Sequence, residues 1–303
     1  RKPVKSSHLS KKFKKIGLTA IAGTLAATSY ANALIVIGDD VWGDGIQADA
    51  AGSITDPSAN LAVDLQDEKL TINVAGAAVA LGAVTAGTGA DSSSDLVVVQ
   101  NTTAGMNVTI ASIAATVFDF NIDGKTDATA AVNVTVTGNT ALAGGSIVRS
   151  LNATNDIDTT VNFGGTLTLA SGKDLVITGA AKSDATVKIK GAGTSALQDV
   201  NLDDSTGLAI LDIAGTAAQV ISGTIDSVGT AEGTVRVTNT SAGGVTVSGA
   251  MGTGAGIKEV ITVASSKLTA SGATLTSATV TNAGTLLATG ATSFLVDTVV
   301  NSG

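Results

Sequence analysis

The sequence lacks cysteine and has one histidine and few aromatic residues, and these gaps exclude much of enzyme chemistry. Its 303 residues include 36 glycines but only 2 prolines; aromatic residues make up 2% and charged residues 14%. Without thiols the chain forms no disulfide bond, Cys-His dyad or cysteine zinc site. The only imidazole, His8, lies in a basic segment that we predict is removed, so the mature chain has no Ser-His-Asp triad.

The amino-terminal segment, 1–33, has the three parts of a secretory signal peptide. Seven of the 17 lysines and arginines fall in the first fifteen positions, an apolar run covers residues 16–27, and Ala31-Asn32-Ala33 offers small residues for cleavage. The alternative is an amphipathic or nucleic-acid-binding basic arm, which would need neither the apolar run nor the cleavage site. We predict that residues 1–33 are a signal peptide and that the protein is exported to a bacterial cell surface, the outer membrane or the extracellular space.

Removal of this segment makes the chain strongly acidic. Ten lysines and arginines then face 25 aspartates and glutamates, a net charge of -15. Such a surface disfavours binding to nucleic acid. No later run reaches the roughly 18 apolar residues of a transmembrane helix, so we expect none in the mature chain. The expected partners are host or matrix surface components, or copies of the protein itself.

From about Val63 onward, short alternating phrases predict an all-β fold. Residues 132–138 read VNVTVTG, 187–191 read VKIKG and 245–249 read VTVSG. Alternation with period two, rich in β-branched residues and bounded by glycine, is typical of half-buried strands.

Two arrangements suit so many short strands. Antiparallel β-sandwich modules normally need aromatic and leucine-rich inner faces, whereas a β-solenoid fills a narrow core with small apolar residues. The composition favours a right-handed parallel β-helix, or β-solenoid, with turns of about 20 to 25 residues. We predict a signal peptide at 1–33, an N-terminal cap at 34–62, which contains Trp42 and several aspartates, and the solenoid domain at 63–303.

Several phrases resemble a known family. They are LDIAGTAAQVISGTID at 211–226, GTVRV at 233–237, KLTASGATL at 267–275 and VNFGGTLTL at 161–169. The first three are similar to repeats in the passenger regions of rickettsial surface cell antigens, which are autotransporters, and the fourth resembles a phrase common in autotransporter passengers generally. The resemblance implies an exported, extended β-helical protein of the surface coat that serves in adhesion or antigenicity. An autotransporter passenger is followed by a translocator barrel, and these residues contain no candidate for one. We therefore expect either further chain or another route to the surface, as in surface-layer subunits.

Residues 119–127, DFNIDGKTD, have the order of a calcium loop. Oxygen atoms at alternating positions converge in such loops because glycine permits the sharp turn. The candidate ligands are Asp119, Asn121, Asp123 and Asp127. The competing interpretation is an Asp-Gly turn between strands, with Phe118 and Phe120 directed inward. An EF-hand is excluded because its twelfth position is Ala130. We expect no other cofactor.

Paired carboxylates at Asp203 and Asp204, with Asp199 nearby, are the one pattern that suggests a glycosidase or lyase. A solvated Asp-Asp-Ser turn explains them more simply, and we predict no catalytic residue. The glycine-rich stretch 252–256 lacks the Gly-Lys-Ser/Thr of a phosphate loop and is interpreted as a turn. Asn-x-Ser/Thr sequons, including those at Asn152 and Asn239, follow from the threonine-rich composition and need no glycan.

The sequence thus predicts a non-enzymatic surface structural or adhesive protein. The alternative is a self-assembling surface-layer or filament subunit, in which strand edges pair between copies and calcium bridges acidic surfaces. A third hypothesis is a secreted carbohydrate-active β-helix, which would lose activity when Asp203 or Asp204 becomes asparagine.

Overall fold

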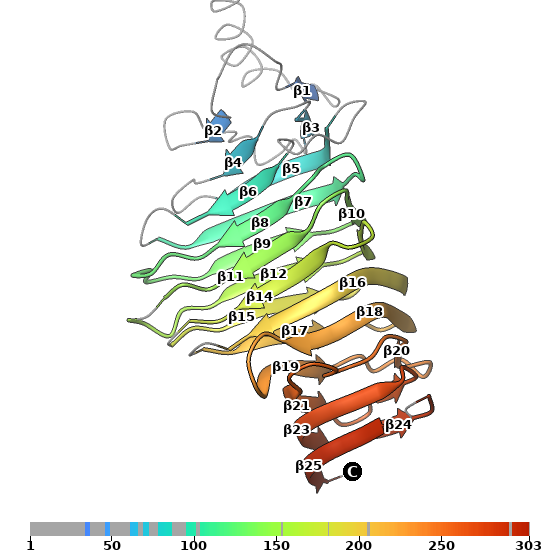
Figure 1. The fold of residues 1–303 in the computed structure, drawn as a ribbon. Helices are drawn as coiled ribbons and strands as arrows, with labels where there is room; N and C mark the ends of the chain where they lie inside the picture. Colours follow the sequence, from blue (N-terminus) through green and yellow to red (C-terminus); the bar gives the residue numbers. More distant parts are fainter. Residues whose placement is uncertain are drawn as a thin grey trace, which may run out of the picture.

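The alternating segments form parallel strands that stack as a β-solenoid (Figure 1). The computed structural model describes residues 34–36, 46–48, 61–65, 69–72, 78–86, 95–100, 104–152, 154–180, 182–204, 207–290 and 293–302. These residues contain no helix, and hence no helix long and apolar enough to cross a membrane. The predicted all-β solenoid is confirmed. The sandwich alternative is wrong because neighbouring strands run parallel.

Each complete turn contributes to three faces. Face 1 contains β1 (Leu34–Val36), the last residues of β3 (Leu61–Asp64), β5 (Ala78–Thr85) and β7 (Met106–Ile113), and then β10 (Thr140–Leu142), β13 (Leu167–Leu169), the first part of β16 (Gly193–Asp203) and of β18 (Gln219–Ser227), β20 (Val245–Val247), β22 (Lys267–Ala270) and β24 (Thr285–Ala288). Face 2 contains β2 (Ile46–Ala48), β4 (Leu70–Ile72), β6 (Leu96–Val99), β8 (Phe120–Asp123), β11 (Ser146–Arg149), β14 (Asp174–Thr178), the second parts of β16 and β18, and the first parts of β23 (Thr274–Asn282) and β25 (Ser293–Asn301).

Face 3 continues without interruption along the stack. It contains the first parts of β3, β5 and β7, and then β9 (Val132–Val136), β12 (Thr159–Phe163), β15 (Ala185–Ile189), β17 (Ala209–Ile213), β19 (Glu232–Val237), β21 (Ile257–Thr262) and the second parts of β23 and β25.

The period-two pattern separates core from surface on each strand. In β9 the three valines are buried, whereas Asn133 is exposed and Thr135 is half-buried. The register carries this alternation from turn to turn, because Val134 pairs with Val161 and Val161 with Val187. Inward residues therefore stack on inward residues and form one continuous core.

The core is narrow and consists mostly of valine, leucine and isoleucine. Two phenylalanines are its largest fully buried side chains. Phe120 on β8 and Phe163 on β12 meet edge to face, with ring centroids 6.3 Å apart and planes at 84°. This geometry is favourable for aromatic pairs and adds to the hydrophobic contribution of each ring.

The turns shorten toward the carboxyl end. Asn139 bonds to Thr166 across a turn of 27 residues, whereas Asn282 bonds to Asn301 across a turn of 19 residues. The main cause is the corner between faces 2 and 3, where loops 124–131 and 150–158 give way to β23 and β25, which pass the corner as continuous strands. The stack accordingly narrows toward its C-terminal end (Figure 1). The expected turn of about 20 to 25 residues is too short for the middle of the stack, because the pattern does not reveal how much loop each corner holds.

The predicted N-terminal segments fall largely outside the described residues. This applies to the signal peptide at 1–33 and, within the expected cap at 34–62, to Trp42 and its neighbouring aspartates. Of the cap, β1 and β2 are described, and they pair in parallel with β3 and β4. These strands follow the same stacking as the rest of the solenoid.

Candidate functional site

The candidate calcium ligands lie on and beside β8, on face 2. Phe120 and Ile122 point into the core, so Asn121 and Asp123 lie on the outer side of the strand. The inward placement expected of Phe120 is confirmed. Phe118 is half-buried, and the Lys173 ammonium lies 5.0 Å from its ring centre, so the expectation was wrong for this residue.

The first two candidates bond to the backbone of the next turn. The carboxylate of Asp119 accepts a hydrogen bond from the Gly145 amide at 2.8 Å. The side-chain oxygen of Asn121 accepts one from the Ile147 amide at 2.9 Å. Each contact spans 26 residues, which is one turn. These two oxygens act as clamps between turns.

The other two candidates form ion pairs. Asp123 holds Arg149 through two contacts, Oδ1 to Nε at 2.6 Å and Oδ2 to Nη2 at 2.9 Å. Asp127 accepts Lys125 Nζ at 2.5 Å. The hydrogen bond from Lys125 lowers the pKa of Asp127, and the hydrogen bond to Asp123 raises the pKa of Arg149. Both carboxylates thus already have a cationic partner.

The structure therefore does not gather the four candidates around one point. Within the part of the chain that is described, no group of three or more acidic, histidine or cysteine side chains could hold a metal ion. Calcium binding at residues 119–127 stays a prediction. It would require Asp123 and Asp127 to exchange their cationic partners for the ion.

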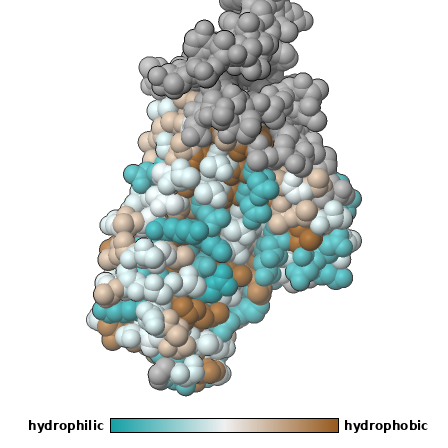
Figure 2. All heavy atoms as spheres, turned by 180° about the vertical axis from the view of Figure 1, so that it is seen from behind, coloured by the Kyte–Doolittle hydropathy of each residue, from teal (hydrophilic) through white to brown (hydrophobic). Residues whose placement is uncertain are grey.

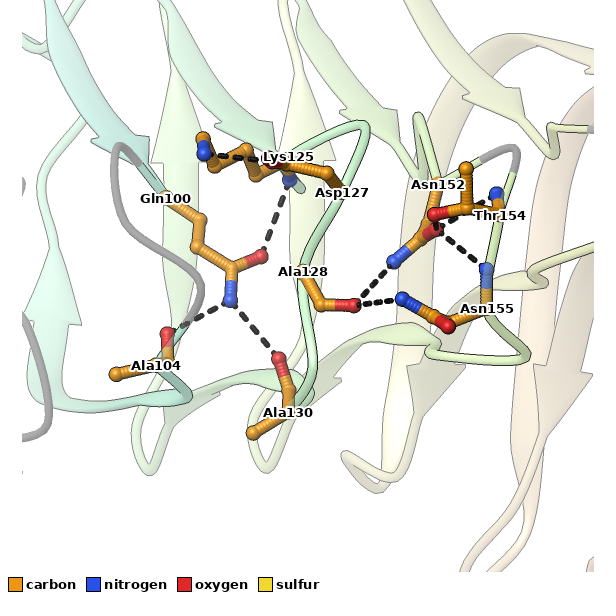
Figure 3. A network of polar contacts seen from close by, with 9 residues as sticks. All are labelled: Gln100, Ala104, Lys125, Asp127, Ala128, Ala130, Asn152, Thr154 and Asn155. Atoms are coloured by element: carbon orange, nitrogen blue, oxygen red, sulfur yellow. Dashed lines mark hydrogen bonds and ion pairs between the residues drawn. The ribbon is translucent and has the colours of Figure 1, made fainter.

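Buried amides organise the loops at this corner, a feature that sequence reasoning missed (Figure 3). Gln100, which is 3% exposed, donates from Nε2 to the carbonyls of Ala104 and Ala130, both at 2.8 Å. Its Oε1 accepts the backbone amide of Lys125 at 3.0 Å. One side chain thus satisfies three backbone groups in two successive turns, and these groups would otherwise lack partners inside the corner.

A second amide repeats this arrangement one turn further on (Figure 3). Asn152 donates to the Ala128 carbonyl at 2.7 Å and accepts the backbone amides of Thr154 and Asn155. Asn155 donates to the same carbonyl at 2.9 Å. The loop carbonyls of Ala128 and Ala130, which could have been metal ligands, are therefore bonded to side-chain amides.

Two of the sequons are incompatible with a glycan in the folded state. Asn152 is 1% exposed and Asn239 is 0% exposed. The Asn239 amide donates to the Ala217 carbonyl at 2.7 Å and to Gln219 Oε1 at 2.6 Å. Both asparagines therefore serve as internal hydrogen-bond donors.

The paired carboxylates at residues 203 and 204 lie where β16 ends. Asp204 Oδ2 is 3.0 Å from Lys258 Nζ, and its Oδ1 accepts the Ala209 backbone amide. The Asp204 side chain is 4% exposed, whereas that of Lys258 is 47% exposed. Asp203 is half-buried, and Asp199 accepts the Thr224 hydroxyl. Asp204 is thus bound within a structural ion pair, which suits a corner clamp better than a proton donor to substrate.

The glycine-rich stretch 252–256 folds around a carboxylate of the chain itself. Asp226 Oδ2 accepts the Gly254 amide and the Thr253 hydroxyl, both at 2.8 Å. Asp226 therefore occupies the position that an anionic ligand would take in a glycine-rich anion site, in keeping with the interpretation of this stretch as a turn.

Aspartates also connect successive turns at the start of face 3. Asp158 accepts the Asp184 amide at 2.9 Å, and Asp184 accepts the Leu208 amide at 3.1 Å. The same arrangement joins Asn139 to the Thr166 amide. An Asp or Asn that bonds to a backbone N–H one turn later is thus the recurrent polar device of this solenoid.

The carboxyl of Asp184 makes the stability of the stack depend on pH, and one substitution tests this dependence. Burial raises the pKa of this carboxyl above 3.8; the hydrogen bond from Leu208 opposes the shift, and the charges of Asp158 and two other aspartates add to it. The folded state therefore binds the proton more tightly than the unfolded chain, so this contribution to stability is present at low pH and is lost as the pH rises through the folded-state pKa.

We expect Asp184→Asn to raise the free energy of unfolding at neutral pH, because the amide oxygen still accepts the Leu208 N–H and carries no charge. The gain should shrink toward acidic pH, where the wild-type carboxyl is protonated in both states. Urea unfolding of both proteins across this pH range measures the difference. An Asp184→Asn protein that is less stable than wild type at neutral pH would contradict the expectation.

Figure 2 shows a mosaic of hydrophilic and hydrophobic residues on one side of the molecule. Comparisons with protein-family models, with curated proteins and with solved structures found no match to this chain.

Proposed function

We propose that the protein is an exported, non-enzymatic surface element that acts as an extended β-solenoid spacer and adhesive surface, in the manner of an autotransporter passenger. The observation that carries this proposal is the stacked outer face. On face 3 the outward residues Asn107, Asn133 and Thr160 lie in register, turn above turn. A stiff stack presents such columns at fixed spacing, which suits many weak contacts to a host or matrix surface.

The polar side chains support this proposal because many of them are bound within the stack. Asp119, Asn121, Asp158 and Asp184 bond to the next turn. Side chains committed in this way brace the rod and leave its shape as the principal property of the molecule.

Export and shape are tested separately. A fusion of the chain to alkaline phosphatase, which folds only outside the cytoplasm, should be active in a bacterial host and inactive when residues 1–33 are deleted. Solution scattering and sedimentation of the purified chain should give an elongated monomer that calcium does not change. A globular particle, or a fusion that is equally active without residues 1–33, would refute the proposal.

The second candidate function is a self-assembling surface-layer or filament subunit. A specific observation favours it: on the last described turn the outward residues Leu287, Leu295 and Val300 are exposed and apolar, whereas the residues in register with them one turn earlier are threonines. For this candidate, sedimentation should show growth beyond the monomer, and growth that depends on calcium would make residues 119–127 the first segment to substitute.

A further inference from the structure

The outer side of face 3 carries a regular array of uncharged polar side chains on three successive turns. Where β7, β9 and β12 form this face, their inward residues are buried and their outward residues are all asparagine or threonine. These outward residues lie in register as two columns, one of Asn107, Asn133 and Thr160 and the other of Thr109, Thr135 and Asn162. We call these six residues the face 3 array.

Stacking fixes the spacing of the array in two directions. Neighbours within a column lie on paired strands, which are about 4.8 Å apart. The two columns are separated by two residues along each strand, which is about 6.7 Å. The array therefore presents hydrogen-bonding groups on a small two-dimensional lattice. Lys188, which is in register with Asn162, ends the second column on the following turn.

The array keeps its polar groups available for a partner outside the protein. Asn107, Thr109 and Asn133 are exposed, and the other three residues are half-buried. Among the described residues, the one side-chain hydrogen bond of the array joins Asn133 Nδ2 to Asn107 Oδ1 at 3.4 Å. On face 2, by contrast, Asn121 and Asp123 are both bonded to the next turn. Bracing of the stack therefore does not account for the polar groups of the array.

The array is also free of charge, although the chain as a whole is acidic. Residues 106–118, 128–148 and 159–172 contain no lysine, arginine, aspartate or glutamate. The charged residues between positions 106 and 172 lie on or beside face 2 and in the loops that follow it, and they are Asp119, Asp123, Lys125, Asp127, Arg149, Asp156 and Asp158. Face 3 is thus neutral on these turns, which suits a neutral partner.

A neutral partner that repeats in two directions at these distances is ice. Water oxygens in hexagonal ice repeat along one axis at nearly the spacing of stacked strands, and across that axis at nearly the spacing of alternate residues of a strand. The threonine hydroxyl can both donate and accept a hydrogen bond, and its methyl group orders the water beside it. A charged side chain would instead keep its own hydration shell, which does not fit the lattice.

We propose that the face 3 array binds the surface of ice crystals. This inference rests on the proposed function, because it names the surface to which the exported, adhesive rod holds. The stiffness of the stack is essential to it, since six groups that are fixed in register meet a lattice without first being ordered.

Adsorption of the purified full chain to slowly growing ice tests the inference. Wild type should concentrate in the ice fraction, whereas serum albumin stays in the liquid, and it should separate the freezing point of a small ice crystal from its melting point. Asn133→Lys and, separately, Thr109→Lys should lose both properties, because each places a long charged side chain on the array.

Thr168→Lys is the matched control. Thr168 is an exposed outward threonine on β13, in face 1. It therefore receives the same charge outside the array, and this variant should bind ice as wild type does. Circular dichroism checks that each variant folds. Asn133, Thr109 and Thr168 are all exposed, so these substitutions leave the core unchanged.

The outcomes separate this inference from the proposed function, because solution scattering is measured on the same protein. An elongated monomer that stays in the liquid overturns ice binding and leaves the spacer intact. A globular particle refutes the spacer itself. Ice binding that survives both Asn133→Lys and Thr109→Lys, or that Thr168→Lys abolishes as well, shows that the face 3 array is not the binding surface and also overturns the inference.

Discussion

Replacing Phe163 with alanine is expected to lower the free energy of unfolding by about 3–5 kcal/mol. The ring is fully buried on β12 and meets Phe120 edge to face across the interior. In a core built mainly of valine, leucine and isoleucine, few neighbours are large enough to refill the space. The loss therefore includes both the hydrophobic contribution of the ring and the cost of the remaining cavity.

Phe294→Ala is the matched control for this prediction. Phe294 occupies an inward position but is 46% exposed at the end of the stack, so its loss leaves no enclosed cavity and should cost much less. Urea unfolding followed by circular dichroism measures both variants. Equal losses for Phe163→Ala and Phe294→Ala would show that the interior around Phe163 relaxes freely, contrary to a packed solenoid core.

The strands could be predicted from the sequence, whereas their partners could not. Alternation within β9 identifies Val134 as inward, because successive side chains point to opposite faces of a strand. The residue stacked on Val134 is Val161, and that assignment depends on the length of the intervening corners. Because the turns shorten along the stack, no fixed repeat length reveals the register.

The calcium interpretation illustrates the same limit. Residues 119–127 have the local order of a calcium loop, yet Asp119 and Asn121 bond to Gly145 and Ile147, each 26 residues away. Local spacing shows which oxygen atoms are close along the chain, whereas the stacking of the turns determines which groups those oxygen atoms bond to. Recurrence of Asp or Asn at about one turn, as at Asp158 and Asp184, was the signal in the sequence for this arrangement.

The buried amides were unpredictable for a different reason. Glutamine and asparagine are mostly found at the surface, and nothing near Gln100 or Asn152 in the sequence marks either as internal. They are buried because a loop that folds inward over a corner leaves backbone groups without water, and a side-chain amide supplies both a donor and an acceptor there.

Glycine bounds the alternating phrases of the sequence, and the structure gives a physical reason for three of these glycines. Gly223, Gly249 and Gly272 lie one above another at the corner between faces 1 and 2. A Cβ atom on Gly249 would overlap the Gly223 carbonyl oxygen, and one on Gly272 would overlap the Gly249 carbonyl oxygen. The glycines are therefore required by the close approach of successive turns.

Gly249→Ala is accordingly expected to destabilise the protein by about 3 kcal/mol or more, at or beyond the upper end of the usual cost of overpacking. The methyl group would overlap the carbonyl oxygen and carbon of Gly223 and crowd the amide nitrogen of Thr224, and these atoms can move only if two turns separate along the stack. The turns on either side are hydrogen-bonded to one another. Moving them apart to remove the overlap at this corner would therefore strain the neighbouring strand pairs. Urea unfolding measures the loss, and hydrogen exchange should show it concentrated in β18, β20 and β22.

Gly172→Ala separates this clash from an effect of alanine on the backbone. Gly172 has a φ of +71°, and no heavy atom lies within 4 Å of the place that a Cβ would take, so alanine there costs only the left-handed conformation, about 1–2 kcal/mol. Gly249 does not have a left-handed φ, so the cost of alanine there comes only from its contact with the neighbouring turn. If Gly249→Ala were no more destabilising than Gly172→Ala, the corner would have room to open, and close stacking of the turns could not be the reason for glycine at this position.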